Sequence, residues 1–181
     1  MKKFILGFLA LFLFITSSAA NQIKPYEIVH QKNTSFANRL RAQIFIVSPD
    51  AQTLEQRVDT AKIAATDYSL KTNAKVVSVF LVPFKQAAGT GYNYAIANYW
   101  SDGCGNSGTQ CNNKQWEVNA TDQQLTDLEL KIAYEYYANL NKFLDKYGLP
   151  DEQKLTSYVA KKLKIKTKDA NPTMLFLESI E

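Results

Sequence analysis

The chain has 181 residues, 46% of them hydrophobic, and a formal net charge of +4 at pH 7. This length suits one domain with an adequate hydrophobic core. The charge is too small to require an acidic partner, and binding of nucleic acid usually needs a concentrated basic face. Composition and charge therefore give no support to a nucleic-acid partner.

Residues 1–20 have the pattern of a secretory signal peptide. Lys2 and Lys3 form a basic start, residues 4–15 form an apolar run, and Ser18, Ala19 and Ala20 offer the small residues that a signal peptidase reads. A membrane anchor is the alternative, but a spanning helix needs about 20 apolar residues and this run is shorter. We therefore expect cleavage after Ala20, no stable membrane span afterwards, and a periplasmic or secreted protein.

From residue 25 to residue 100 the pattern predicts the order β-β-α-β-β. Residues 25–31 and residues 36–47 (FANRLRAQIFIV) read as strands, the second with one buried face. Thr53 and Gln56 fit a capping box at the start of a helix that continues to about Lys71. Residues 74–82 (AKVVSVFLV) are almost wholly apolar, which is typical of a central strand covered on both faces. Residues 92–100 read as a further strand.

The second half of the chain predicts helices after a turn-rich bridge at residues 101–120. Thr121 and Gln124 fit a second capping box, followed by a long helix to Tyr147 and a shorter helix at residues 151–163. The tail at residues 171–180 is open: Asn171 and Pro172 favour a helix, and a strand at residues 174–177 is the alternative.

The predicted fold class is α+β, with a small, mostly antiparallel sheet and a packed C-terminal helical segment. We expect one domain at residues 21–181. It comprises the sheet and helix at residues 21–101, a cysteine-bearing loop at residues 102–120, and the helical segment at residues 121–181.

Cys104 and Cys111 are the only cysteines, and both lie in the polar stretch SDGCGNSGTQC. In an oxidising compartment, paired thiols close into a disulfide, and the glycines between and around them leave the backbone free to do so. Structural zinc needs about four Cys or His ligands, and His30 is the only histidine. A redox pair would more naturally read C-x-x-C at the start of a helix. The sequence therefore predicts a disulfide that pins a polar loop, with no metal and no cofactor.

The first half of the chain resembles a family of exported bacterial proteins, domain of unknown function 4875. The resemblance rests on residues 26–28, 38–41, 53–56 and 74–81, and on the glycine turn and residues 95–103. It covers about half of the chain after the leader and implies no activity. The cysteine loop and the tyrosine-rich helix depart from the pattern or lie outside it.

Two groups of side chains are candidates for a ligand or partner surface. Arg39 and Arg41, about 7 Å apart on one strand face, could hold a carboxylate or a phosphate. The alternative is a solvated or salt-bridged face. Tyr92, Tyr94 and Trp100 share one parity along a strand and could present rings to a sugar, a peptide or a protein. The alternative is that these rings simply cover the sheet.

Other chemistry-bearing residues have simpler interpretations. His30 has no histidine partner, and the chain contains no G-x-S-x-G nucleophile motif. Acidic residues around the predicted long helix are typical of a wet helix face, although a glycosidase uses two such acids across a cleft. They are Asp122, Asp127, Glu129 and Glu135. Lysines 161, 162, 164, 166 and 168 indicate a solvated face, with an anionic surface as the functional alternative.

These observations predict a non-enzymatic binding or interaction protein of the bacterial cell envelope, whose partner is an envelope protein or polymer. Two alternatives stay open. One is a hydrolase that acts on an envelope polymer through a carboxylate pair. The other is an inhibitor or immunity-type protein that inserts a loop into the cleft of its partner.

Overall fold

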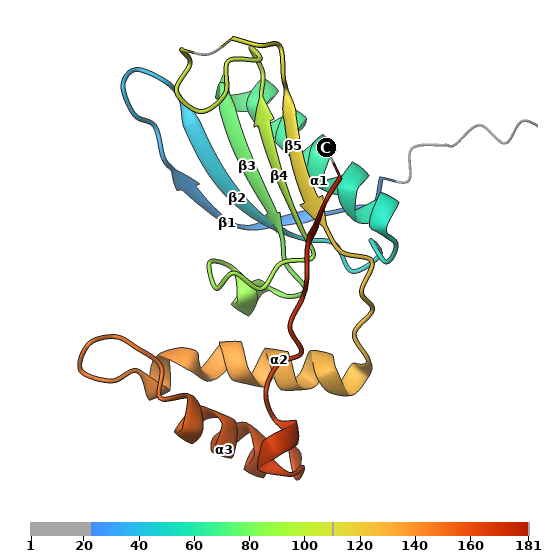
Figure 1. Cartoon of the computed structure of the whole chain (residues 1–181), viewed down its shortest axis with the longest axis vertical. Coiled ribbons are helices and arrows are strands. Elements are labelled where there is room, and N and C mark those ends of the chain that lie inside the picture. Colours follow the sequence, from blue (N-terminus) through green and yellow to red (C-terminus); the bar gives the residue numbers. More distant parts are fainter. Residues whose placement is uncertain (1–22, 110, 181) are drawn as a thin grey trace, which may run out of the picture.

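The computed structural model describes residues 23–109 and 111–180, in which six strands form one sheet (Figure 1). Strand order in the sheet follows the chain, β1 to β6. Strands β2 and β3 are parallel, and every other neighbouring pair is antiparallel. The predicted α+β fold with a mostly antiparallel sheet is therefore confirmed. The strands are β1 (Glu27–Asn33), β2 (Arg41–Val47), β3 (Val76–Leu81), β4 (Ala95–Trp100), β5 (Trp116–Ala120) and β6 (Glu178–Ser179).

Helix α1 (Leu54–Thr72) connects β2 to β3, and this crossover allows the two strands to run parallel. The predicted capping box at its start is confirmed. Thr53 Oγ1 accepts a hydrogen bond from the Gln56 backbone N–H at 3.2 Å, and Gln56 Oε1 accepts one from the Thr53 N–H at 3.1 Å. Asn73 ends the helix in the left-handed conformation at φ 59°, a common C-terminal stop.

Helix α1 covers one face of the sheet, and Figure 1 shows it behind the strands. Its alanines, among them Ala61 and Ala65, are fully buried against Val77 and Val79 of β3 and Ala97 of β4. These sheet residues alternate along their strands, as expected when one face is packed. Burial of this alternating set fixes the register, because a shift by one residue would move it to the opposite face.

The intervening residues of β3 are less buried than the sequence predicted. Ser78 and Phe80 point away from α1 and are half-buried, whereas Val77 and Val79 have no exposed surface. The prediction that this strand is covered on both faces is therefore wrong for its central part. A serine within a run of β-branched residues marks the side that no helix covers.

A buried arginine ties α1 to the chain that leaves the sheet. The Arg57 side chain is 1% exposed, and its Nε donates to the Ala51 carbonyl at 3.3 Å. Its Nη1 donates to the carbonyls of Thr121 and Gln123, and its guanidinium carbon lies 4.0 Å from the centre of the Tyr94 ring. A buried charge is tolerated when its donors are satisfied in this way. Arg57 thus holds the segment after β5 against the start of α1.

Residues 127–169 form a helical layer beyond one end of the sheet (Figure 1). Its apolar cluster includes Ile132, Leu155 and Val159, and the Ala133 side of α2 packs toward Val82 and Tyr92. Within the described residues we find no helix that combines the length and the apolar composition needed to cross a membrane. The helices are α2 (Asp127–Asn139) and α3 (Glu152–Leu163), with short 3₁₀ turns η1 (Lys85–Ala87), η2 (Leu140–Phe143) and η3 (Thr167–Asp169).

The predicted long helix is shorter at both ends. Its capping box is formed by Thr126 and Glu129, not by Thr121 and Gln124. The α-helix ends at Asn139, whose side chain donates to the Glu135 carbonyl and competes with the backbone ladder. The chain then tightens into η2.

Several strand boundaries also differ from the prediction. Strand β2 begins at Arg41, because Ala37 and Asn38 have positive φ angles and form a tight turn before it. Strand β4 begins at Ala95 rather than at residue 92. The bridge at residues 101–120 contains β5, and the tail is extended and contains β6, so the expected helix at residues 171–180 is wrong. The predicted signal peptide at residues 1–20 lies outside the described residues.

Candidate functional site

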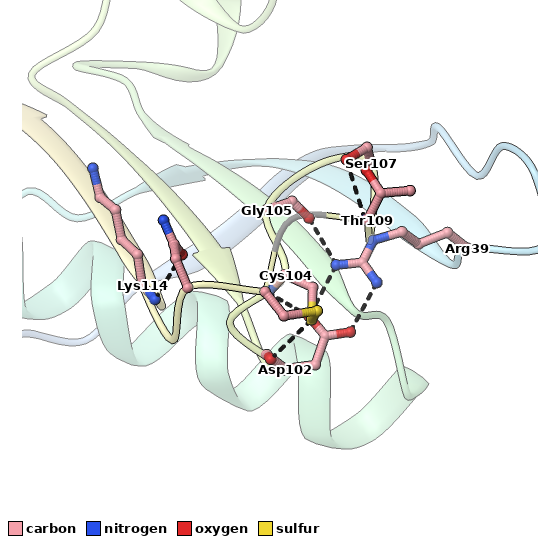
Figure 2. The surroundings of a disulfide bond; sticks show 9 residues. Arg39, Asp102, Cys104, Gly105, Ser107, Thr109 and Lys114 are labelled. Atoms are coloured by element: carbon pink, nitrogen blue, oxygen red, sulfur yellow. Dashed lines mark hydrogen bonds and ion pairs between the residues drawn. A yellow bond between two sulfur atoms is a disulfide. The ribbon is translucent and has the colours of Figure 1, made fainter.

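The predicted disulfide is present: Cys104 and Cys111 are bonded, with a sulfur–sulfur distance of 2.07 Å. Figure 2 shows the Arg39 guanidinium facing the loop that this bond closes. Arg39 Nη1 and Nη2 donate to the two carboxylate oxygens of Asp102 at 2.8 and 2.9 Å, and Nη2 also donates to the Gly105 carbonyl at 2.7 Å. A two-pronged arginine–carboxylate pair fixes geometry as well as charge. The pair therefore clamps the loop to the turn before β2.

Trp100, the last residue of β4, also holds this loop. The indole is 6% exposed, and its Nε1 donates to Asn106 Oδ1 at 2.9 Å. At Gly103 the φ angle is 65°, and an added Cβ would lie 2.7 Å from Asn113 Cα. Only glycine fits this close approach of two backbone segments. The disulfide loop is thus folded back on the end of the sheet.

The five residues predicted to form a surface do not lie together. Arg39 is part of the loop clamp, and the Arg41 guanidinium carbon lies 5.9 Å from the centre of the Phe36 ring. Tyr92 is 5% exposed and donates its hydroxyl to the Thr173 carbonyl at 3.0 Å. Tyr94 packs under Arg57 in the core beside α1. Arg39 is thus in a salt bridge, Tyr92 and Trp100 are buried, and Tyr94 is half-buried, which agrees with the alternatives that the sequence left open for these candidates.

A different set of side chains shares the sheet face opposite α1, which we call the open face. Directly opposed residues on neighbouring strands lie on the same side of a sheet. One line of opposed residues crosses five strands and consists of polar side chains, and we call it the polar row. Ser78 Oγ donates to Asn98 Oδ1 at 2.7 Å within it. Its members are Lys32, Gln43, Ser78, Asn98 and Glu117.

A second line of opposed residues runs beside the polar row, and we call it the ring row. The Phe45 and Phe80 rings stack with centroids 4.8 Å apart, and the His30 ring lies 5.6 Å from that of Phe45. Two residues of strand rise, about 7 Å, separate neighbouring lines on one face. The open face thus places the polar row beside a line whose central members, Phe45, Phe80 and Ile96, are apolar. The ring row consists of His30, Phe45, Phe80, Ile96 and Asn119.

A pocket of about 420 Å³ lies where the two rows meet the loop before β4. Lys32 and Gln43 border it from the polar row, and His30, Phe45 and Phe80 border it from the ring row. This sheet-face pocket is within the size range of small-ligand sites, and it joins an apolar wall to a few polar groups, as such sites do. Lys32 is the charged side chain in its described lining, and no aspartate or glutamate is part of that lining.

The loop at residues 88–93 forms the remaining wall of the sheet-face pocket. Gly89 and Gly91 have φ angles of 81° and 85°, which side-chain-bearing residues rarely adopt. Asn93 also lines the pocket and is 5% exposed, and its Oδ1 has no hydrogen-bond partner among the described residues. Buried polar groups in folded proteins are nearly always paired, so the Asn93 oxygen has an unmet hydrogen-bonding capacity beside the pocket.

Of the four candidate acids, Glu129 and Glu135 have structural roles in the helical layer, whereas Asp122 and Asp127 are exposed. Glu129 closes the capping box of α2 and accepts a hydrogen bond from the Thr173 hydroxyl at 2.7 Å. Hydrogen bonds from the Thr126 backbone and then from the Thr173 hydroxyl lower the pKa of its carboxyl. Glu135 pairs with Lys162 at 2.6 Å. Within the described residues no three or more His, Cys, Asp or Glu side chains gather as they would to hold a metal ion.

Comparison with known proteins places the chain in a family. The family model described as a domain of unknown function, DUF4875, matches residues 21–173, and the chain belongs to this family. The resemblance of the first half is thus confirmed and extends over most of the chain. No curated protein matches this chain.

A solved structure is also similar. It is the crystal structure of a protein from Desulfovibrio piger that is described as a DUF487 family protein. The two sequences are 28% identical, the TM-score is 0.70, and the match covers 88% of this chain and 96% of that chain. The fold is therefore shared, and neither description states an activity.

The Arg39–Asp102 pair predicts a defined acid sensitivity. The hydrogen bonds from the Arg39 side chain lower the pKa of the Asp102 carboxyl to about 2, from an unfolded value near 3.8. Its stabilising effect is complete above the unfolded value and is lost as pH falls through about 2. Because the pair is partly exposed, we expect Asp102→Asn to lower the free energy of unfolding by about 1 kcal/mol or less at pH 7.

Urea unfolding of both proteins between pH 7 and pH 1.5 measures this effect. The difference should shrink toward zero as pH falls to about 2. The matched control is Asp169→Asn, at an exposed acid of η3, which should show little difference at any pH. A wild-type advantage that persists unchanged below pH 2 would show that the carboxylate charge does not matter.

Proposed function

We propose that this protein is an exported, non-enzymatic binding protein of the bacterial cell envelope, and that its binding site is the open face with the sheet-face pocket. The observation that carries the proposal is the unpaired Asn93 oxygen, buried beside a pocket with an aromatic wall and polar edges. An unsatisfied buried amide oxygen lowers the stability of the fold by about 1–3 kcal/mol. Packing alone would be served better by an apolar side chain at position 93.

Export is supported by two independent features. Residues 1–20 have the charge and hydropathy pattern of a signal peptide, and the structure contains a disulfide, which is typical of oxidising compartments. Arg39 binds Asp102 and the Gly105 carbonyl, which flank Cys104. The closed disulfide therefore supports the contacts that hold this loop at the end of the sheet.

A binding role agrees better with the arrangement of acids than the hydrolase alternative does. Hydrolysis of a glycosidic bond needs two carboxyl groups across a cleft, one of them with a raised pKa. Glu129 and Glu135 are instead engaged in a helix cap and an ion pair, and the pKa of Glu129 is lowered. Polar groups on the open face are amides and a hydroxyl beside Lys32 and Glu117, a set suited to recognition.

Export predicts a specific mature product. When the full chain is produced in a Gram-negative host and the cells are fractionated without reductant, we expect the protein in the periplasm with Asn21 as its first residue. Intact-mass measurement and thiol titration should show one disulfide and no free thiol. A full-length product in the cytoplasm with two titratable thiols would contradict export.

Binding at the open face predicts sensitivity to a polar-row substitution. The purified protein is mixed with a small-molecule extract of bacterial envelopes and examined by native mass spectrometry, where a bound adduct is expected. Gln43→Leu, which replaces an amide at the pocket by an apolar group of similar size, should raise the dissociation constant of the adduct about fivefold, since a lost hydrogen bond is worth about 1 kcal/mol, and so lower its occupancy. Gln153→Leu on the exposed side of α3 is the matched control and should leave it unchanged. Equal occupancy in all three proteins would remove the open face from the binding site.

A further inference from the structure

We propose that the ligand of the sheet-face pocket is an amphiphilic organic anion, a molecule with one acidic group and a flat apolar body. This inference rests on the proposed function and names the ligand class of the same site. Each part of the pocket contributes one requirement, and the three requirements together define the class.

The charge requirement comes from the β1 side of the pocket. Lys32 and His30 both border it, and neither an aspartate nor a glutamate is part of its described lining. The Lys32 ammonium is positive at neutral pH, and a hydrogen bond between charged partners is about twice as strong as a neutral one. A ligand with an acidic group at this end gains this interaction, whereas a cation is repelled.

The apolar requirement comes from the ring row. The Phe45 and Phe80 rings are nearly parallel, with an interplanar angle of 18°, and both line the pocket. Phe80 is only half-buried in the protein alone. A flat apolar group placed there would cover the exposed part of the ring and add aromatic contact. A small inorganic anion would leave this surface in water.

The third requirement is a hydrogen-bond donor. Asn93 Oδ1 is buried and unpaired beside the pocket, on the loop that carries Gly89 and Gly91. A donor on the ligand body, an N–H or O–H, would satisfy it. Asn93 lies just before β4, and β2 and β3 separate β4 from β1 in the sheet, so the donor belongs at the end of the ligand away from its acidic group.

Binding of model compounds tests the class. The probes are phenylacetate, which has the ring and the charge; phenylacetamide, which has the ring and a neutral amide in place of the charge; acetate, which has the charge alone; and the neutral sugar methyl N-acetylglucosaminide. Each is titrated into ¹⁵N-labelled protein with its disulfide intact. Amide shifts of Gly89 and Gly91 and of the Asn93 side chain report on the pocket. We expect phenylacetate to bind at least about tenfold more tightly than phenylacetamide or acetate.

Two variants and a control separate the contributions. Lys32→Met should abolish the preference of phenylacetate over phenylacetamide, whereas Lys71→Met in the last turn of α1 should preserve it. Asn93→Leu should weaken 4-hydroxyphenylacetate, which carries a donor, at least about fivefold more than phenylacetate. Because it removes an unpaired buried group, Asn93→Leu should also leave the melting temperature unchanged or raise it by a few degrees. If Asn93 instead stabilised the fold, Asn93→Leu would lower the melting temperature.

The outcomes distinguish the ligand class from the proposed function. Equal affinity for phenylacetate and phenylacetamide, or no effect of Lys32→Met, would overturn the anionic class. Sugar-induced shifts at the same amides without phenylacetate binding would also overturn it, while the pocket would stand as a binding site. If no probe shifts these amides but the envelope adduct is still lost in Gln43→Leu, the class fails and the proposed function survives.

Discussion

The period-two geometry of the strands is the constraint on which the rest of this structure depends. Only one helix, α1, packs along the strands in the described part of the chain, and it buries alternate residues such as Val77, Val79 and Ala97. Every intervening residue must then face the other way. The polar row and the ring row are this second set, so packing on one face determines the chemistry presented on the other.

The two ends of the sheet are closed by different interactions, and both leave the open face accessible. At one end the disulfide loop is clamped by Arg39 and held by Trp100. At the other end the α2 and α3 layer packs on the loop before β4 through Tyr92 and Val82. That loop carries Asn93, so the helical layer supports one wall of the sheet-face pocket without covering it.

Features set by short-range chemistry could be predicted from the sequence. Neighbouring residues are enough to predict the capping box of Thr53 and Gln56 and the disulfide between Cys104 and Cys111. They are also enough to predict the apolar strands β2 and β3. Strand β5 could also have been predicted, because apolar and polar residues alternate along residues 116–120. The turn-forming residues before it favour a loop over the whole segment. The tail could not be predicted, because Asn171 and Pro172 favour a helix locally while bonds to Tyr92 and β5 hold the segment extended.

The candidate site was beyond sequence reasoning for a related reason. Grouping Tyr92 and Tyr94 by parity requires a strand from residue 92, whereas β4 begins at Ala95. Tyr92 is instead buried, and Tyr94 is half-buried under Arg57. The polar row joins residues from five strands, and only their register reveals that Lys32, Gln43 and Ser78 are neighbours. Ser78 within an apolar strand was the one local signal for it.

Strand β3 has one face packed against α1 and one face accessible from solvent. Thiol labelling of Ser78→Cys and Val79→Cys, two small substitutions on adjacent residues, tests this most directly while the native disulfide stays closed. We expect a maleimide reagent to label the Ser78→Cys protein under native conditions and the Val79→Cys protein only after unfolding. Protection of both positions, or faster labelling at 79 than at 78, would contradict it.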